Sequence, residues 1–381
     1  MGPRWPKWAC VLAAPACGAL GLLLLHWRLP LPAASGPPEP PARLWPQAWE
    51  PLLGGPQPGR PGAAEQCVVM FDNRTAPVPA NATDLGRLPY LSLTLASNAL
   101  YARHHGYRFL FYNFSQGGCK HAVPELQDGK EAAPPRVHEL PMTWCKLVAI
   151  EDALFGGEGR PPCQRVLLLD SDAVVSDLHT PLEDFAARHG RGKSILIGHL
   201  DNATMSASDQ ELWQVHGVQR HHPWMFFSQR GGGNFLNAGV IIFQRGDGQR
   251  LRAVLREWWR SAARQPPLLA PGRPRPCWGD CLHKWPHEQA VFEIFVWPQF
   301  REDVALLPLG LMNGFSGKFV RHVWGIVKDR RAEVMSQALA ALATAAMLPE
   351  VGAGAVRPRP PLPGPLRGSE TAAAGPAAEG R

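Results

Sequence analysis

The sequence predicts an α/β protein with one mostly parallel sheet flanked by helices, and three observations support this. Strand-like and helix-like segments alternate between about residues 67 and 348. The connections between them are mostly short. One segment, 165–175, is too apolar to face water on either side, as in a central parallel strand. Ligands of such sheets bind beyond the C-terminal ends of the strands.

Each expected element has its own signal. Residues 88–105 carry Leu91, Leu95, Ala99 and Ala102 at spacings of three and four, which is typical of a helix face. Short apolar runs are expected to form the other strands, at 67–71, 107–111, 194–198 and 235–243. The other helices are expected at 143–155, where Gly156-Gly157 is a stop signal, and at 249–263 and 287–295.

The composition divides the chain of 381 residues into parts. Forty prolines and 38 glycines are too many for one compact core, and they crowd both ends. The middle is long enough to bury a full α/β core. We therefore expect a cytosolic leader, a transmembrane signal anchor, a Pro-rich stem, one folded domain and a disordered tail, at 1–7, 8–27, 28–65, 66–348 and 349–381.

The anchor is expected because the run from Trp8 to Leu25 has no charged residue and follows Arg4 and Lys7. Eighteen residues in a helix span about 27 Å, enough for a thin bilayer. Such a single-pass type II anchor would place the folded domain in the lumen. The small residues at 13–19 leave a cleaved signal peptide as the alternative.

Cysteines and sequons agree with a lumenal body. Four Asn-x-Ser/Thr sequons start at Asn73, Asn81, Asn113 and Asn202. Six cysteines lie outside the anchor and permit up to three disulfides. Cys277 and Cys281 are close enough for a local bridge. The alternative at this place is a zinc site built from Cys277, Cys281, His283 and His287.

The basic residues give no sign of a nucleic-acid partner. The net charge is +7 and the isoelectric point is about 9.1. Arginines and lysines are scattered rather than clustered, so the charge is interpreted as a general surface property. A nucleotide diphosphate would use only a few of them.

Two carboxylates follow the apolar segment 166–169 directly, in Asp170-Ser171-Asp172. On an extended chain both would point to the same side and would repel unless a cation lay between them. Mn²⁺ and Mg²⁺ bind such oxygens and keep positions open for substrate phosphates. A divalent metal site is therefore expected here. A solvated turn is the alternative, which the apolar residues 173–175 disfavour.

Several short blocks occur in order around this motif. They are Leu168-Leu-Asp170-Ser-Asp172-Ala-Val-Val and the segments 101–107, 144–147, 236–240, 287–290 and 319–325. The first resembles the metal-binding segment of GT-A glycosyltransferases. The whole set, over about residues 67–327, is similar to glycosyltransferase family 34, which includes Golgi α-galactosyl-, α-mannosyl- and xyloglucan α-xylosyltransferases. The last block lacks the Cys-Lys that often follows His-x-x-Gly, which leaves the sugar open.

The resemblance implies roles for individual residues. Asp170 and Asp172 would hold the metal, with His322 as the third protein ligand. Ser171 would lie in the donor site, and Lys146 would pair with a phosphate or a donor hydroxyl, unless it is an ordinary exposed helix residue.

Three further blocks concern the donor sugar. Asn237 and Gly239 would shape its pocket, although Asn-Ala-Gly is also typical of a bulge. Glu288 and Gln289 would lie near the anomeric carbon. The relatives retain anomeric configuration, so either Glu288 forms a covalent intermediate or front-face attack needs only electrostatic support, which suits Gln289.

The resemblance implies a GT-A catalytic domain with a Rossmann-like sheet. Its function would be metal-dependent, retaining transfer of a hexose or pentose from a nucleotide sugar, with UDP-galactose or UDP-xylose favoured, to a glycan or glycoprotein. Mn²⁺ or Mg²⁺ would be the cofactor, and the Golgi membrane the location, with an oligomer left open. The alternatives are a family 8-like or arabinosyl-type transferase, and a noncatalytic glycan-binding protein on a transferase fold.

Overall fold

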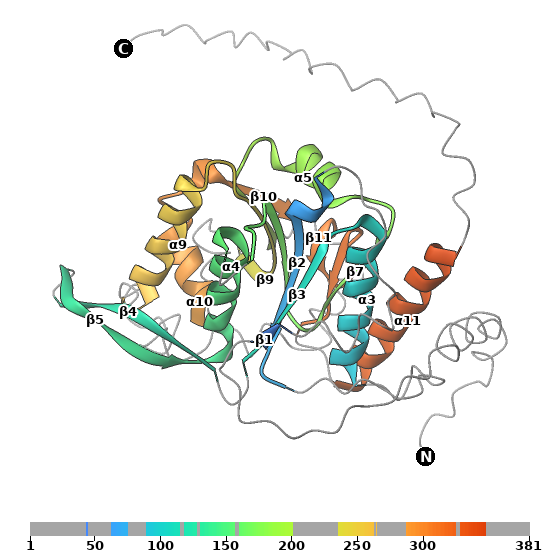
Figure 1. Cartoon of the computed structure of the whole chain (residues 1–381), viewed down its shortest axis with the longest axis horizontal. Coiled ribbons are helices and arrows are strands. Elements are labelled where there is room, and N and C mark those ends of the chain that lie inside the picture. Colours follow the sequence, from blue (N-terminus) through green and yellow to red (C-terminus); the bar gives the residue numbers. More distant parts are fainter. Residues whose placement is uncertain are drawn as a thin grey trace, which may run out of the picture. The chain divides into compact units, whose positions relative to one another are not determined.

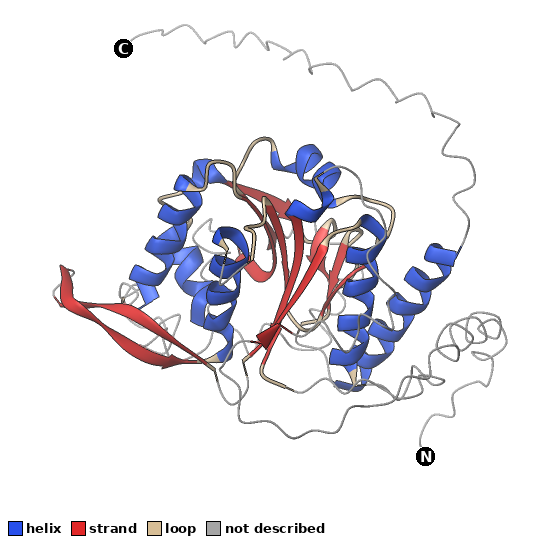
Figure 2. Cartoon of the chain, viewed as in Figure 1, coloured by secondary structure: helices blue, strands red, loops and turns tan. Residues whose placement is uncertain are grey.

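A seven-stranded sheet forms the centre of the computed structural model, with helices on both faces (Figures 1 and 2). The residues described are 43–44, 62–74, 89–114, 118–127, 130–156, 160–200, 235–262, 264, 287–324 and 328–347. The strand order is β1-β3-β2-β6-β9-β8-β10. The strands are β1 (Arg43–Leu44), β2 (Gln66–Asp72), β3 (Arg108–Asn113), β6 (Arg165–Leu169), β8 (Ile195–Leu200), β9 (Phe235–Gln244) and β10 (Val304–Pro308).

Strand direction confirms the predicted α/β class, with a mostly parallel sheet flanked by helices. β2 pairs in parallel with β3 and with β6, and β8 pairs in parallel with β10. β9 lies between β6 and β8 and is antiparallel to both. Its direction brings the start of β9 beside the end of β6, where Asp170 follows.

The two faces of the sheet carry separate apolar cores. Val69 and Leu168 face α4 (Cys145–Phe155), α9 (Gln249–Ala262) and α10 (His287–Val291). Val68 and Leu167 face the other side, where α3 (Tyr90–His105) and α5 (Leu182–Gly190) pack. Because all four side chains are fully buried, the central strands have no face exposed to water. The side chain of Trp258 in α9 is also fully buried in the first of these cores.

The predicted continuous strand over 165–175 is wrong, because the chain turns at residues 170–172. β6 ends at Leu169, and the N–H of Ala173 bonds the carbonyl of Asp170 at 3.0 Å. The next three residues form β7 (Ala173–Val175), in a second sheet with β12 (Val320–His322) and β11 (Met312–Gly314). The apolar residues on both sides of the turn belong to two different sheets.

Some elements of the structure were not predicted from the sequence. A hairpin of β4 (Cys119–Gln127) and β5 (Lys130–Leu140) stands beside the core, and a 20-residue helix, α11 (Lys328–Met347), follows the last strand. The predicted helix at 287–295 is α10 followed by a π-helical segment, Phe292–Val296.

Four of the eight cysteines form disulfides within the described residues. Cys67 pairs with Cys163, and Cys119 pairs with Cys145, with Cα–Cα distances of 6.0 and 5.5 Å. The former ties the start of β2 to the loop before β6. Cys277, Cys281 and His283 lie outside the described residues. The local bridge and the zinc site therefore both stay predictions.

The prediction of a Golgi membrane location with a single-pass type II anchor is wrong for the part of the chain that the structure describes. Crossing a bilayer takes about 20 predominantly apolar residues. None of the helices described is both long and apolar enough for this. The longest of them, α11, begins with the charged run Lys328-Asp329-Arg330-Arg331. Residues 8–27 themselves lie outside the described residues.

Candidate active site

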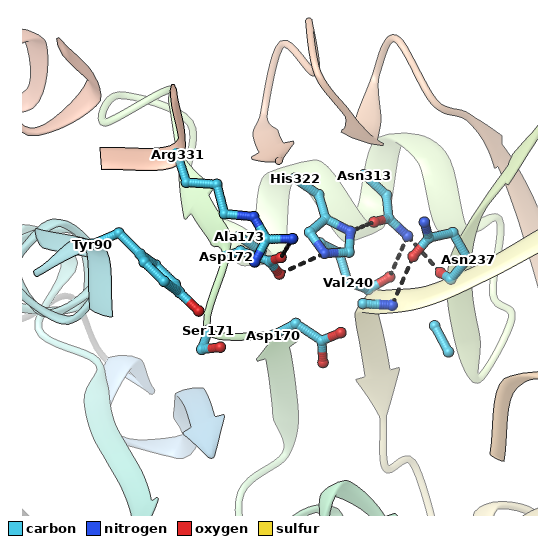
Figure 3. Close-up of polar contacts among 12 residues, drawn as sticks. Tyr90, Asp170, Ser171, Asp172, Ala173, Asn237, Val240, Asn313, His322 and Arg331 are labelled. Carbon is cyan, nitrogen blue, oxygen red and sulfur yellow. Dashed lines mark hydrogen bonds and ion pairs between the residues drawn. The ribbon is translucent and has the colours of Figure 1, made fainter. Parts of the chain in front are cut away.

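Two aspartates and a histidine converge where β6 ends. Asp170 follows β6, Asp172 precedes β7, and His322 is the last residue of β12. One potential ligand atom from each of the three lies within 4.8 Å of the others. The antiparallel pairing of β12 with β7 sets His322 opposite Ala173, beside the second aspartate (Figure 3). The turn at residues 170–172 thus keeps together the two carboxylates that the sequence placed on an extended strand.

The His322 ring is held by a hydrogen-bond network that fixes its orientation. Its Nδ1 lies 2.7 Å from Oδ1 of Asn313, whose Nδ2 donates to the backbone carbonyls of Asn237 and Val240 (Figure 3). Because the Asn313 amide uses its nitrogen as donor, its oxygen is the acceptor and Nδ1 carries a proton. The other ring nitrogen, Nε2, faces Oδ1 of Asp172 at a distance of 2.9 Å.

Gly239 makes room for this ring. A Cβ on Gly239 would lie 1.9 Å from Cε1 of His322 and less than 3 Å from both ring nitrogens. Asn313 reaches its place with a positive φ of 79°, a conformation that asparagine tolerates better than most residues. Gly198 permits the close approach of Asn313, since a Cβ there would lie 2.6 Å from the Asn313 Cβ.

The pKa values of the two aspartates are shifted in opposite directions. Burial alone would raise the pKa of Asp172, but His322 and Arg331 outweigh burial and lower it to about 2. Burial raises the pKa of Asp170, against the opposing effects of Lys146 and His322. Asp172 is therefore ionised at neutral pH, and the ionised form of Asp170 is the one that a nearby cation would stabilise most.

Lys146 lies beneath the site and is almost fully buried, with 2% of its side chain exposed. Its ammonium lies 2.8 Å from Glu288 Oε1, 3.3 Å from Asp170 Oδ1 and 3.0 Å from the carbonyl of Ala238. Burial lowers the pKa of Lys146, but the two carboxylates more than offset this and raise it overall. The ammonium therefore organises α4, α10 and β9 around Asp170. Its pairing with a phosphate stays a prediction.

The remaining predicted residues line the same edge. Asn237 Oδ1 accepts from the N–H of Gly239 at 2.9 Å, and Gln289 Oε1 accepts from the N–H of Ala238 at 2.9 Å. Glu288 is paired with Lys146, while its Oε2 is buried without a hydrogen bond among the described residues. β9 and α10 thus meet at Asn237-Ala-Gly239, and the catalytic roles of these side chains stay predictions.

Several residues at this site were missed by sequence reasoning. Asp72, at the end of β2, holds Arg74, whose Nη2 also donates to Ser171 Oγ at 2.8 Å. Arg331 of α11 lies 3.3 Å from Asp172 Oδ2. Only the end of a predicted parallel strand could have drawn attention to Asp72. Nothing in the sequence around Asn313 or Arg331 places them here. Residues 231–233 and the side chain of His287 lie outside what the structure describes.

The three groups fit a divalent cation. Two lone-pair atoms 2.9 Å apart, such as His322 Nε2 and Asp172 Oδ1, need a proton or a cation between them. Asp170 Oδ1 is buried and makes no hydrogen bond within the described residues, and its partner there is the Lys146 ammonium at 3.3 Å. Two carboxylates and an imidazole are ligands that Mn²⁺ accepts.

Comparisons with known proteins gave limited similarity. No family model matches the chain, and no curated protein matches its sequence. Among solved structures, the chain is similar to a glycosyltransferase involved in the glycosylation of the major capsid of PBCV-1, with 14% identity, a TM-score of 0.40 and coverage of 71% of this chain and 98% of that one. It is also similar to the glycosyltransferase GlyE of Streptococcus pneumoniae TIGR4, with 9% identity, a TM-score of 0.32 and coverage of 73% and 62%. At such low similarity, the function is inferred from the chain's own residues.

Proposed function

We propose that this chain is a metal-dependent, retaining glycosyltransferase that moves a hexose or pentose from a nucleotide sugar to a glycan or glycoprotein. The observation that carries the proposal is the convergence of Asp170, Asp172 and His322 at the C-terminal end of a buried parallel strand. This is where ligands of α/β sheets bind. The resemblance of the surrounding blocks to family 34 favours UDP-galactose or UDP-xylose as donor.

The proposed division of roles follows from charge and position. Asp170, Asp172 and His322 would hold Mn²⁺ or Mg²⁺, and a cation there would act as a Lewis acid that neutralises charge on a leaving diphosphate. Asn313 keeps His322 in the tautomer that a metal ligand needs, as a partner to the second ring nitrogen commonly does. We assign residues 66–348 to this catalytic domain.

The contacts of Glu288 favour front-face attack over a covalent intermediate. A nucleophilic carboxylate must approach the anomeric carbon. Glu288 is 3% exposed, and its Oε1 is held by Lys146 at 2.8 Å. Gln289 lies next to it, with Oε1 on the N–H of Ala238 and a second lone pair still available to the donor sugar. We expect no glycosyl adduct on Glu288, and mass spectrometry that detected one would exclude this mechanism.

Donor hydrolysis provides the test of the proposed function. The full-length protein is incubated with UDP-galactose or UDP-xylose, with and without Mn²⁺, and release of UDP is measured. We expect Mn²⁺-dependent release from one donor and loss of release in Asp172→Asn. Lys193→Met, which removes a partly exposed charge just before the start of β8, serves as the control with unchanged release. Equal hydrolysis by wild type and Asp172→Asn would show that the metal assignment is wrong.

A further inference from the structure

The carboxylate of Asp172 contacts a histidine and an arginine through different oxygens. Oδ1 lies 2.9 Å from Nε2 of His322, and Oδ2 lies 3.3 Å from Nη2 of Arg331. Figure 3 shows these two side chains reaching Asp172 from separate elements, β12 and α11. Arg331 lies in none of the sequence blocks that resemble family 34. The resemblance therefore assigns no role to this arginine beside a candidate metal ligand.

Arg331 is brought to the site by a packed helix. Met335, one turn further along the same face of α11, is fully buried in a cluster with Leu93 of α3 and Val174 of β7. The guanidinium also lies 5.7 Å from the ring centre of Tyr90, which begins α3. Since α11 packs against both α3 and β7, the arginine is held near Asp172 whether or not it is bonded to it.

The guanidinium of Arg331 is only partly engaged. It reaches one carboxylate oxygen through Nη2, its Nε is buried without a hydrogen bond among the described residues, and 20% of its side chain is exposed. The other cations at the motif differ from it. Lys146 is buried with three partners, and Arg74 is bonded to Asp72 as well as to Ser171. Arg331 thus keeps donors available for an additional anion.

A divalent cation at the site would compete with this arginine. Both are positive and both use the carboxylate of Asp172, so binding of one weakens the hold of the other. A guanidinium presents several N–H groups in a planar fork, which suits the oxygens of a diphosphate. A nucleoside diphosphate on the metal would supply those oxygens close to Asp172.

We propose that Arg331 is an exchangeable counter-ion that neutralises Asp172 in the metal-free protein and binds the diphosphate of the donor once the metal occupies Asp172. This inference rests on the proposed function. It adds a donor-binding residue and an order of events, in which metal binding releases the arginine for the nucleotide.

Two binding measurements on the full-length protein test the inference without any turnover. The first is titration with Mn²⁺ alone, followed by the electron paramagnetic resonance signal of free Mn²⁺. The second is calorimetric titration with UDP at saturating Mn²⁺. The variants are Arg331→Gln, Arg331→Lys and, as a matched loss of charge at an exposed position of α9, Arg256→Gln.

The two affinities of Arg331→Gln are expected to change in opposite directions. Removing a competing ion pair should strengthen binding of Mn²⁺ alone by about 2- to 5-fold. Removing charged hydrogen bonds to the diphosphate should weaken UDP binding at least ~10-fold. Arg331→Lys keeps the charge but not the fork, so Mn²⁺ binding should stay near wild type while UDP binding falls. Arg256→Gln should change neither.

The results separate failure of the inference about Arg331 from failure of the proposed function. If Arg331→Gln binds both Mn²⁺ and UDP more weakly, the arginine has only a structural role, and the inference is overturned. Wild-type affinity of Arg331→Gln for UDP, with Mn²⁺ bound, overturns it as well. If the wild-type protein binds no Mn²⁺, the proposed metal-dependent function fails first, and the inference fails with it.

Discussion

Gly239 lies directly beneath the imidazole of His322, so replacing this glycine by alanine tests how the site is built. The added Cβ would lie 1.9 Å from Cε1, 2.6 Å from Nδ1 and 2.7 Å from Nε2 of His322. Because carbon atoms in contact stay about 3.5 Å apart, the ring would have to move by about 1.6 Å. The backbone at Gly239 is held by Asn237 Oδ1 on its N–H and by the N–H of Asp170 on its carbonyl, at 2.9 and 2.8 Å. The ring rather than the strand should therefore move.

The size of the effect follows from the bonds that the ring would lose. Displaced His322 gives up its hydrogen bond to Asn313 and its charged contact with Asp172. One neutral and one charged hydrogen bond together contribute about 2–4 kcal/mol. We expect the free energy of unfolding of Gly239→Ala to fall by that amount in urea titrations. Mn²⁺ binding should weaken by at least ~10-fold, since one of the three proposed protein ligands is misplaced.

Two comparisons test whether the effects of Gly239→Ala come from the clash with His322. Gly310→Ala is the matched control, because a Cβ at Gly310 meets nothing within 4 Å. In a His322→Ala background the clash no longer exists, so Gly239→Ala should then change the free energy of unfolding by less than about 1 kcal/mol. Wild-type Mn²⁺ affinity in Gly239→Ala, or an equal loss of stability in both backgrounds, would refute the reasoning.

Three further predictions concern stability in urea or thermal unfolding. Lys146→Met leaves the buried carboxylate of Glu288 and the half-buried carboxylate of Asp170 without their cation, and should lower the free energy of unfolding by about 3–5 kcal/mol. Burial raises the pKa of Glu293 from 4.5 to about 8, against a smaller opposing effect of a backbone N–H. The folded state therefore keeps a proton that the unfolded state loses, and stability should fall by up to about 1.4 kcal/mol per pH unit between pH 4.5 and 8. Glu293→Gln should remove this dependence. Cys163→Ser opens a link between residues 96 apart and should lower stability by about 4–5 kcal/mol through loop entropy.

These three predictions have simple controls. Lys193 makes an ion pair with the exposed carboxylate of Glu302, and Lys193→Met should change stability by less than about 1 kcal/mol. A Lys146→Met protein as stable as Lys193→Met would show that the buried ion pairs are not needed. Equal pH profiles for wild type and Glu293→Gln would show that Glu293 is ionised at neutral pH. Under reducing conditions, which also open Cys119–Cys145, wild type and Cys163→Ser should be equally stable, whereas under oxidising conditions wild type should be the more stable of the two.

The central sheet could be predicted from the sequence because its strands are buried on both faces. An uninterrupted apolar run has one plausible place in an α/β protein, and β2, β6 and most of β9 lie where such runs predicted them. The same signal failed at 170–172. Residues 173–175 are as apolar as 166–169, and periodicity alone does not separate one long strand from two short strands in different sheets.

The candidate site was predictable where its residues form local patterns. Asp170-Ser171-Asp172, Asn237-Ala238-Gly239 and His322 lie in short blocks, and the structure brings all three blocks together. The supporting residues could not be found in this way. Asn313 and Arg331 act over separations of 76 residues from Asn237 and 159 residues from Asp172, respectively, and only the packing of β11 and α11 defines these contacts. Gly239 was expected to shape a sugar pocket, whereas its observed contact is with His322.

Strand register explains why these blocks must occur in a fixed order. His322 reaches Asp172 because β12 pairs with β7 so that His322 lies opposite Ala173. A slip of one residue would turn His322 to the other face of the small sheet. Gly239 lies under the ring because its carbonyl accepts from the N–H of Asp170, just beyond the paired part of β6 and β9. Two independent pairings therefore meet at one imidazole, and a change in either register would remove the proposed metal site while leaving the apolar core largely intact.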